Sequence, residues 1–213
     1  MRVIITGCEY TGKTTLIEEL HQWSGEMGIR FHLDDHFTIP ETQHLNEADQ
    51  EAMLALSPVL KERFQRFQAQ YHVHVMHRNE HILLAGYHIE EAVYGPLYYY
   101  GQSPYYIRQL ETEMPSDTIL VLLTARPEVI RKWMTEAPHP HTIIKEQDIP
   151  MLLDRFQGEF SQSLLRKKIR IDTSDLTPKA LLQEFLTAAE PHLNEKDLLR
   201  FLMRRLSRDS RKL

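Results

Sequence analysis

The sequence is short of cysteine, with only Cys8 among its 213 residues. A single cysteine cannot form a disulfide bond within the chain, and this is typical of the reducing cytosol, so we expect a cytoplasmic protein. Long apolar runs are also missing, since none approaches the roughly 20 residues of a membrane-spanning helix. Only four apolar or near-apolar residues follow Arg2, so we expect neither a signal peptide nor a membrane partner.

The sequence also has no excess of positive charge. The net charge of −5 argues against a protein whose whole surface binds nucleic acid. No internal repeat or linker is visible, so we expect one domain over residues 1–213. Its C-terminal helix, over 195–213, is basic. A solvated helix face is the favoured interpretation, and a nucleic-acid contact is the less favoured one. The basic residues are Arg200, Arg204, Arg205, Arg208, Arg211 and Lys212.

A glycine loop stands near the start of the chain. Its sequence, Gly7-Cys8-Glu9-Tyr10-Thr11-Gly12-Lys13-Thr14, fits G-x-x-x-x-G-K-[ST] at every fixed position. The β-branched run 3–6 before it indicates a buried strand, and the apolar residues after it, from Leu16 to Trp23, have helical spacing. A strand, this loop and a helix are the context in which the pattern binds a nucleoside triphosphate. A plain glycine turn is the less favoured alternative.

The loop predicts both a nucleotide site and a metal site. Its backbone N–H groups, over Gly7 to Thr15, would surround the phosphates of ATP. Lys13 would lie between the β- and γ-phosphates, and Thr14 would offer its hydroxyl to Mg²⁺. The predicted cofactors are therefore ATP and Mg²⁺. The predicted ATP-binding residues are Gly7, Cys8, Glu9, Tyr10, Thr11, Gly12, Lys13, Thr14 and Thr15.

Strand-like and helical segments alternate along the chain, which predicts an α/β fold with a parallel sheet and helices on both faces. The strand-like runs are 3–6, 28–33, 81–86, 118–123 and 168–172. Helix starts are predicted at Asn46 and at Ser57-Pro58, Ser103-Pro104 and Thr177-Pro178. The helix after Pro58 is predicted to bury Leu60, Phe64, Phe67, Tyr71 and Val75.

Two aspartates, Asp34 and Asp35, follow the second predicted strand. Ligands of an open α/β sheet bind at the carboxyl ends of its strands, where the glycine loop also lies. A carboxylate there can order Mg²⁺ or accept a proton from an attacking hydroxyl. We favour this functional reading, with Asp34 also at the metal, over an aspartate pair that merely caps a turn.

Two kinase families share these motifs. The glycine loop with Asp34-Asp35-His36-Phe37 resembles uridine and nicotinamide riboside kinases, which implies that Asp34, or else Asp35, is the catalytic base. Residues 83–95 are similar to the D-R-[YFH]-x-x-S-x-x-[AV]-Y-[QG] segment of thymidylate kinases. The matching positions are Tyr87, Val93, Tyr94 and Gly95.

The match to thymidylate kinases is incomplete. Ala85 and Gly86 replace the Asp-Arg pair that the family uses to order the metal and the acceptor phosphate, and Glu90 replaces a serine. The resemblance nevertheless implies acceptor binding by Tyr87, Glu90 and Tyr94. Tyr94 belongs to a group of tyrosines that could equally be packing residues. With Ala85 unable to act as an acid, Asp34, Asp35 or Glu90 must supply the carboxylate, and the aspartates are favoured.

The segment 122–131 also looks like thymidylate kinases, which carry L-x-x-x-P-E there and basic residues beyond. Arg131 is therefore a catalytic candidate, and Lys132 and Lys145 are candidates for a lid. Residues 135–147 are proline-broken and aperiodic, so they are either that lid or a simple connection. The resemblance implies a P-loop NTPase fold, with five parallel strands in the order 2-3-1-4-5.

The resemblance implies an ATP-dependent kinase acting on a nucleoside or nucleoside monophosphate, and a homodimer is left open. Two other functions remain. The chain is a nucleotide-binding switch or pseudo-kinase if Ala85 and Gly86 mark a degraded site. It is a kinase of a nucleic-acid-linked or other hydroxyl acceptor if the Arg-rich tail holds a polymer.

Overall fold

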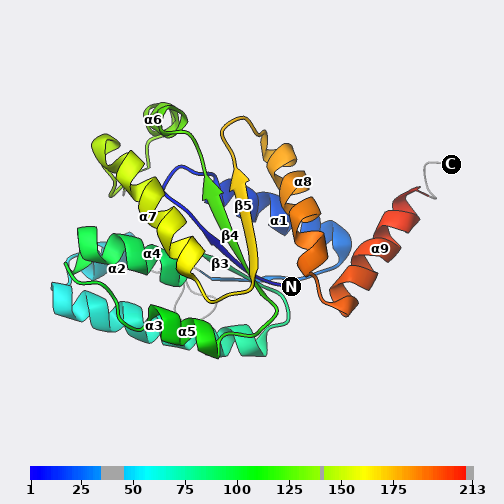
Figure 1. Ribbon diagram of the computed structural model, residues 1–213, viewed down its shortest axis with the longest axis horizontal. Coiled ribbons are helices and arrows are strands. Elements are labelled where there is room, and N and C mark those ends of the chain that lie inside the picture. The colour runs from blue at the N-terminus through cyan, green and yellow to red at the C-terminus, as the bar shows by residue number, and fades with distance from the viewer. Residues whose placement is uncertain (35–45, 140–141, 210–213) are drawn as a thin grey trace.

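A computed structural model describes residues 1–34, 46–139 and 142–209. Five parallel strands form one sheet in the order β2-β3-β1-β4-β5. The predicted fold class and strand order are thus confirmed. Figure 1 shows the sheet in the middle of the molecule, with helices on either side. The strands are β1 (Arg2–Thr6), β2 (His32–Asp34), β3 (Ile82–Ala85), β4 (Thr118–Thr124) and β5 (Lys167–Asp172).

The central strand, β1, explains why the sheet forms where it does. Val3, Ile4 and Ile5 are fully buried, because β3 and β4 flank the strand and helices cover both of its faces. The second strand was predicted from Gly28, but it begins at His32. Gly28 instead ends the first helix in the left-handed conformation, at φ 64°, and donates its N–H to the Gly25 carbonyl.

Helices cover both faces of the sheet. One apolar cluster joins the strands to α1 (Lys13–Met27) and α8 (Pro178–Ala189), with Phe201 of α9 (Glu195–Asp209) against it. The cluster on the other face involves five helices. These are α3 (Pro58–Arg78), α4 (Tyr87–Tyr94), α5 (Ile107–Glu113), α6 (Pro127–Glu136) and α7 (Ile149–Gln162). None of the helices in the described ranges is both long and apolar enough to cross a membrane.

Shorter elements join these helices: α2 (Glu47–Leu54), the π-helix η1 (Gly95–Tyr99), η2 (Glu146–Asp148) and η3 (Glu190–His192). Three predicted helix starts are confirmed. Asn46 accepts the Asp49 N–H at 2.9 Å, Thr177 accepts the Ala180 N–H at 3.3 Å, and Ser57 precedes α3. The start predicted at Ser103-Pro104 is wrong, because a turn intervenes and α5 begins at Ile107.

The buried face of α3 is only partly the predicted one. Val75 is fully buried, but Leu60 and Phe67 are 52% and 66% exposed. The face that packs on α4 and α5 lies in the second half of the helix, where the Tyr87 hydroxyl donates to the Ala69 carbonyl at 2.5 Å. The residues buried on α3 are Gln68, Ala69, His72, Val73, Val75 and Met76.

Glu111 of α5 lies at the centre of a buried charge network. Its carboxylate accepts hydrogen bonds from His88 Nε2 at 2.9 Å, Arg108 Nη1 at 3.0 Å and the Leu164 N–H at 2.7 Å. Burial opposes its ionisation, but the hydrogen bonds from His88 and Leu164 hold the pKa of Glu111 at about 2. Burial lowers the pKa of His88. The folded state therefore favours a charged Glu111 and a neutral His88.

Acidification is expected to destabilise the protein in two steps. Below the ordinary His pKa of 6.5, the unfolded chain binds a proton that folded His88 disfavours. From pH 4.5 down to about 2, Glu111 binds a proton in the unfolded chain but stays ionised in the folded protein, which lowers stability further. Urea unfolding over this range should show a falling midpoint. Glu111→Gln should be less stable at neutral pH yet lose less stability on acidification, and equal losses in both proteins would contradict this account.

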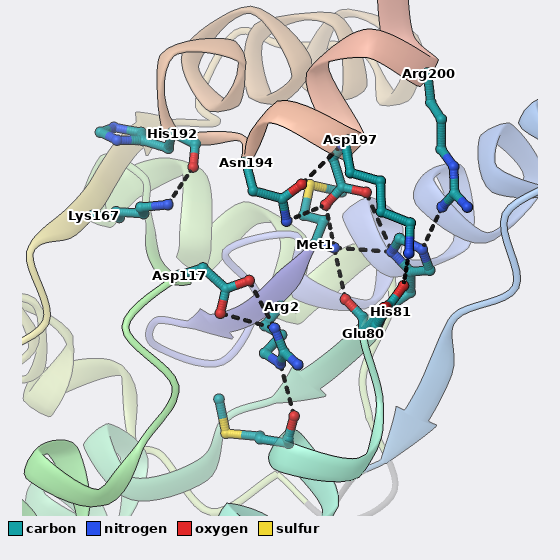
Figure 2. Close-up of polar contacts among 12 residues, drawn as sticks. Met1, Arg2, Glu80, His81, Asp117, Lys167, His192, Asn194, Asp197 and Arg200 are labelled. Atoms are coloured by element: carbon teal, nitrogen blue, oxygen red, sulfur yellow. Dashed lines mark hydrogen bonds and ion pairs between the residues drawn. The ribbon is translucent and has the colours of Figure 1, made fainter.

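A second charge cluster lies at the amino ends of the strands (Figure 2). Arg2, at the start of β1, donates to both oxygens of Asp117, at 2.9 and 2.7 Å, just before β4. The Met1 nitrogen lies 2.6 Å from Asp197 of α9. Lys167, at the start of β5, donates to a backbone carbonyl of η3 at 2.6 Å. These contacts fasten α9 and the connecting turns to the sheet edge opposite the glycine loop.

Candidate functional site

The glycine loop follows β1 and depends on residues with positive φ. Gly7 has φ 149° and Gly12 has φ 85°. A Cβ on Gly7 would lie 2.3 Å from the Leu123 carbonyl oxygen, so only glycine fits there. Tyr10 also has a positive φ, of 63°, which is costly for a bulky residue. Its side chain must therefore be held in place by contacts, which are described below.

Lys13 begins α1 and points back into the loop. Its ammonium donates to the carbonyls of Gly7 at 2.7 Å and Cys8 at 3.1 Å, and it forms an ion pair with Glu90 at 3.0 Å. Three acceptors match the three N–H bonds of an ammonium group. Glu90 lies on α4, so the site joins the first helix to the segment that follows β3. Thr14, the next residue, is exposed.

A cavity of about 660 Å³ opens beside this loop. It is lined by elements from both faces of the sheet, so it lies across the carboxyl edge, where ligands of parallel α/β sheets bind. The loop contributes Glu9, Tyr10, Gly12, Lys13, Thr14 and Thr15. From α2 to η1 the lining residues are Met53, Leu56, Lys61, Phe64, Gln65, Glu90, Tyr94 and Tyr99.

The remaining wall of the cavity comes from α6, the segment after it, and the turn between β5 and α8. Thr173, just after β5, donates from its hydroxyl to the carbonyls of Thr11 and Thr124, both at 3.1 Å. It thereby ties the end of the sheet to the glycine loop. The other residues of this wall are mainly apolar: Trp133, Ala137, His139, Ile143, Leu176, Pro178 and Leu181. An apolar wall of this kind suits a flat base.

Glu9 and Tyr10 connect the glycine loop to His139, Thr142 and Ile143. The Tyr10 hydroxyl accepts the His139 N–H at 2.8 Å and bonds the Thr142 hydroxyl at 2.6 Å. The Tyr10 and His139 rings stack with centroids 4.2 Å apart. Glu9 accepts the Ile143 N–H at 3.3 Å, and burial raises the pKa of its carboxyl. These contacts explain how the positive φ of Tyr10 is maintained.

The side chain of Cys8 lies in the core. It is fully buried, and burial raises the pKa of its thiol to about 11. The reactive thiolate is therefore scarce at neutral pH. We expect a thiol reagent at about pH 8 to label native protein far more slowly than protein unfolded in urea. Equal labelling rates in the two states would show that the thiol is accessible.

The three predicted acceptor residues have different surroundings. Glu90 and Tyr94 line the cavity, and the Tyr94 hydroxyl accepts the Glu9 N–H at 2.9 Å. Tyr94 also meets Phe156 edge to face, at 5.3 Å. Tyr87 is 6% exposed and lies outside the cavity, because its hydroxyl is bonded to α3. The structure therefore brings two of these side chains to the glycine loop and leaves Tyr87 in the core.

The cations predicted for catalysis and for the lid do not line the cavity, although Ala137, His139 and Ile143 of the predicted lid segment do. Arg131 and Lys132 are on α6, where Lys132 lies 3.9 Å from Glu136, and Lys145 is exposed before η2. Asp34 ends β2, so its backbone stands at the carboxyl edge, beside Leu84 of β3. Its side chain and the whole of Asp35 lie outside the described part of the structure.

Sequence reasoning missed Lys61, Phe64 and Gln65, which line the cavity from α3. Their spacing of three and four residues places them on one helix face, and this spacing could have identified them from the sequence. Phe64 was predicted as a core residue, but it is half-buried and faces the cavity. The apolar residues Leu176 and Leu181 were missed because nothing in their sequence distinguishes a cavity wall from core.

Comparison with solved structures identifies the fold. The YorR protein of Bacillus subtilis, solved in complex with phosphorylated GDP, superposes with a TM-score of 0.60 at 17% identity, covering 92% of this chain and 100% of YorR. Deoxyadenosine kinase from M. mycoides, with bound dCTP, gives 0.57 at 12% identity, covering 88% and 97%. The chain has a P-loop kinase fold.

Thymidylate kinase from Candida albicans shares this P-loop kinase fold, with a TM-score of 0.53 at 13% identity, covering 91% of this chain and 94% of that one. By sequence, the chain matches no protein-family model and no curated protein. The likeness therefore lies in the arrangement of strands and helices around the glycine loop.

Proposed function

We propose that the protein is an ATP-dependent kinase that transfers the γ-phosphoryl group to a nucleoside or nucleoside monophosphate. One observation carries the proposal: a single cavity is lined both by the glycine loop and by side chains of α2, α3 and α4. Phosphoryl transfer needs the donor and acceptor in one enclosed space, because catalysis rests on positioning and on charge stabilisation. A protein that only bound ATP would not need the second wall.

The donor half of the proposed site uses the glycine loop. Lys13 would contact the β- and γ-phosphates, and the exposed hydroxyl of Thr14 suits Mg²⁺, which prefers oxygen ligands and few protein contacts. No group of three or more His, Cys, Asp or Glu side chains that could hold a metal occurs among the described residues. In this proposal the Thr14 hydroxyl would hold a metal ion that the nucleotide brings with it. Its chemistry would be to neutralise the charge of the phosphates.

The acceptor half would use the α3 and α4 residues. Phe64 and Tyr94 offer aromatic surfaces, and Gln65 offers both a donor and an acceptor to a base edge. Asp34 is the proposed base, because it ends β2 at the carboxyl edge, and Asp35, the next residue in the sequence, is the alternative. Arg131, Lys132 and Lys145 would serve the moving phosphoryl group only if residues 135–147 act as a lid.

A screen of nucleosides and nucleoside monophosphates for ADP release tests this function. At least one acceptor should stimulate ADP release above the rate with ATP alone. ATP binding without stimulation by any acceptor would favour a nucleotide-dependent switch, the reading suggested by Ala85 and Gly86 at the end of β3. A steep salt dependence of binding to DNA or RNA would favour a polymer substrate.

A further inference from the structure

The cations that the sequence suggested for the moving phosphoryl group do not line the cavity. Arg131 and Lys132 lie on α6, Lys145 precedes η2, and all three are absent from the cavity wall. The segment between them nevertheless touches the glycine loop, where the Tyr10 hydroxyl accepts the His139 N–H. Contact between this segment and the loop therefore does not bring its cations to the site. Another wall of the cavity has to provide the charge.

Two lysines are the cationic side chains of the cavity. Among the described residues, Lys13 and Lys61 are the only Lys or Arg residues that line it. The sequence of 35–45 and 140–141, which lie outside the described ranges, contains no lysine or arginine. Lys13 belongs to the glycine loop, where its ammonium donates to two loop carbonyls. Lys61 comes from α3, the wall on which the acceptor is proposed to bind, so the second charge lies there.

The surroundings of Lys61 leave its ammonium available to a ligand. Within the described part of the chain no carboxylate forms an ion pair with it, and the first turn of α3 contains no acidic residue. The adjacent carboxylate, Glu62, pairs with Arg66 at 3.5 Å instead. Lys61 is half-buried. Partial burial weakens the hydration of an ammonium, so it interacts more strongly with a negative charge that enters the cavity.

Lys61 belongs to the face of α3 that forms the cavity wall. Phe64 and Gln65 stand three and four residues after it, and all three side chains line the cavity. Arg63, between them in the sequence, is exposed and is not part of the wall. Figure 1 shows α6 well away from α3, with α7 and α4 between them in the view. The position of Lys61 on α3, rather than a basic composition of the helix, therefore carries the inference.

We propose that Lys61 is the second catalytic cation of the site and stabilises the phosphoryl group in transfer, in place of the cations on and after α6. This inference rests on the proposed function. In the transfer, an acceptor oxygen bonds to the γ-phosphorus, the bond from this phosphorus to the β–γ bridging oxygen breaks, and ADP leaves with that electron pair. A proton on an acceptor hydroxyl passes to the proposed base. Negative charge spreads over the other three oxygens of the phosphoryl group, and the Lys61 ammonium offsets it.

Steady-state kinetics of ADP release by the full-length protein, with the best acceptor from the screen, test the proposal. Lys61→Gln keeps a long polar side chain but removes the charge. Its kcat should fall about a hundredfold, as is typical when one group that stabilises transition-state charge is lost. The KM values for ATP and for the acceptor should change little. Lys61→Arg keeps the charge and should retain at least about tenfold more turnover than Lys61→Gln.

The matched control is Arg63→Gln, which removes an exposed charge from the same helix and should keep the wild-type kcat. A fall in this control as large as that in Lys61→Gln would overturn the inference, because the effect would not depend on the cavity. Circular dichroism and thermal melting establish that the variants are folded. If Lys61→Gln is unfolded, Lys61→Ala removes the same charge, and the same fall in kcat is expected.

The outcomes separate this inference from the proposed function. A wild type in which no acceptor stimulates ADP release overturns the proposed function, and the inference with it. An active wild type with an equally active Lys61→Gln overturns the inference alone, and a fall in Lys145→Gln would then assign the charge to the predicted lid. A Lys61→Gln protein in which only the KM of the acceptor rises also overturns it, because Lys61 would then bind the acceptor without stabilising the transition state.

Discussion

Lys13→Ala is expected to abolish ATP turnover while leaving the protein folded. The ammonium lies in the glycine loop, where the reacting phosphates are proposed to bind, and the loss of one such charge typically costs about 3–4 kcal/mol of transition-state stabilisation. Turnover should therefore fall by about a hundredfold to a thousandfold. A coupled assay for ADP, with the best acceptor from the screen, measures it.

The control for this experiment is Lys179→Ala, which removes an exposed lysine on α8. It should keep wild-type turnover. Circular dichroism and thermal melting establish that both variants are folded. Because Lys13→Ala also removes the ammonium that pairs with the buried Glu90, its melting temperature should fall, although the protein remains folded. A folded Lys13→Ala protein with undiminished turnover is incompatible with the kinase proposal.

Asp34→Asn is expected to lower phosphoryl transfer by about a hundredfold or more, since general-base catalysis typically contributes about 10²–10⁴. Asparagine keeps the shape of aspartate but cannot accept the proton of an attacking hydroxyl. The affinity for ATP should change little, because the donor phosphates are proposed to contact the glycine loop instead. Single-turnover transfer and calorimetric ATP titration separate the two effects.

Asp35→Asn belongs in the same series, because Asp35 is the next residue in the sequence and the alternative base. Asp154→Asn, at an exposed position of α7, is the matched control. If Asp34→Asn and Asp35→Asn both transfer phosphate at nearly the wild-type rate, the second-strand base is wrong. Glu90 is then the next carboxylate to test as the base. No transfer by the wild type itself would favour the switch.

The sheet could be predicted because its signals are local. The run from Val3 to Thr6 is short, apolar and β-branched, and it forms the centre of the sheet as predicted. A glycine between two elements was harder to assign, because it can end a helix or begin a strand. Gly28 was read as the start of a strand but ends a helix, because its φ of 64° suits the left-handed cap that follows α1. The strand order itself came from the family resemblance, not from local pattern.

The site was harder to predict than the fold. The residues of the glycine loop are contiguous in the sequence, so the loop could be predicted from its pattern. The pairing of Lys13 with Glu90 joins residues on two different helices, and it depends on which way each side chain points. The aromatic spacing of α3 predicted a buried face, but Phe67 is exposed and Phe64 faces the cavity. Periodicity identifies a face of a helix without saying what covers it.

The amino and carboxyl edges of the parallel sheet carry different groups of residues, so substitutions at the two edges should have different effects. The charge cluster of Figure 2, which includes Arg2 and Asp117, lies at the amino edge, whereas the cavity lies at the carboxyl edge. A deep mutational scan that scores cellular abundance and phosphorylated product separately should therefore give two distinct maps. Substitutions at the amino edge should lower abundance and product together, whereas those at Lys13 should spare abundance and remove product.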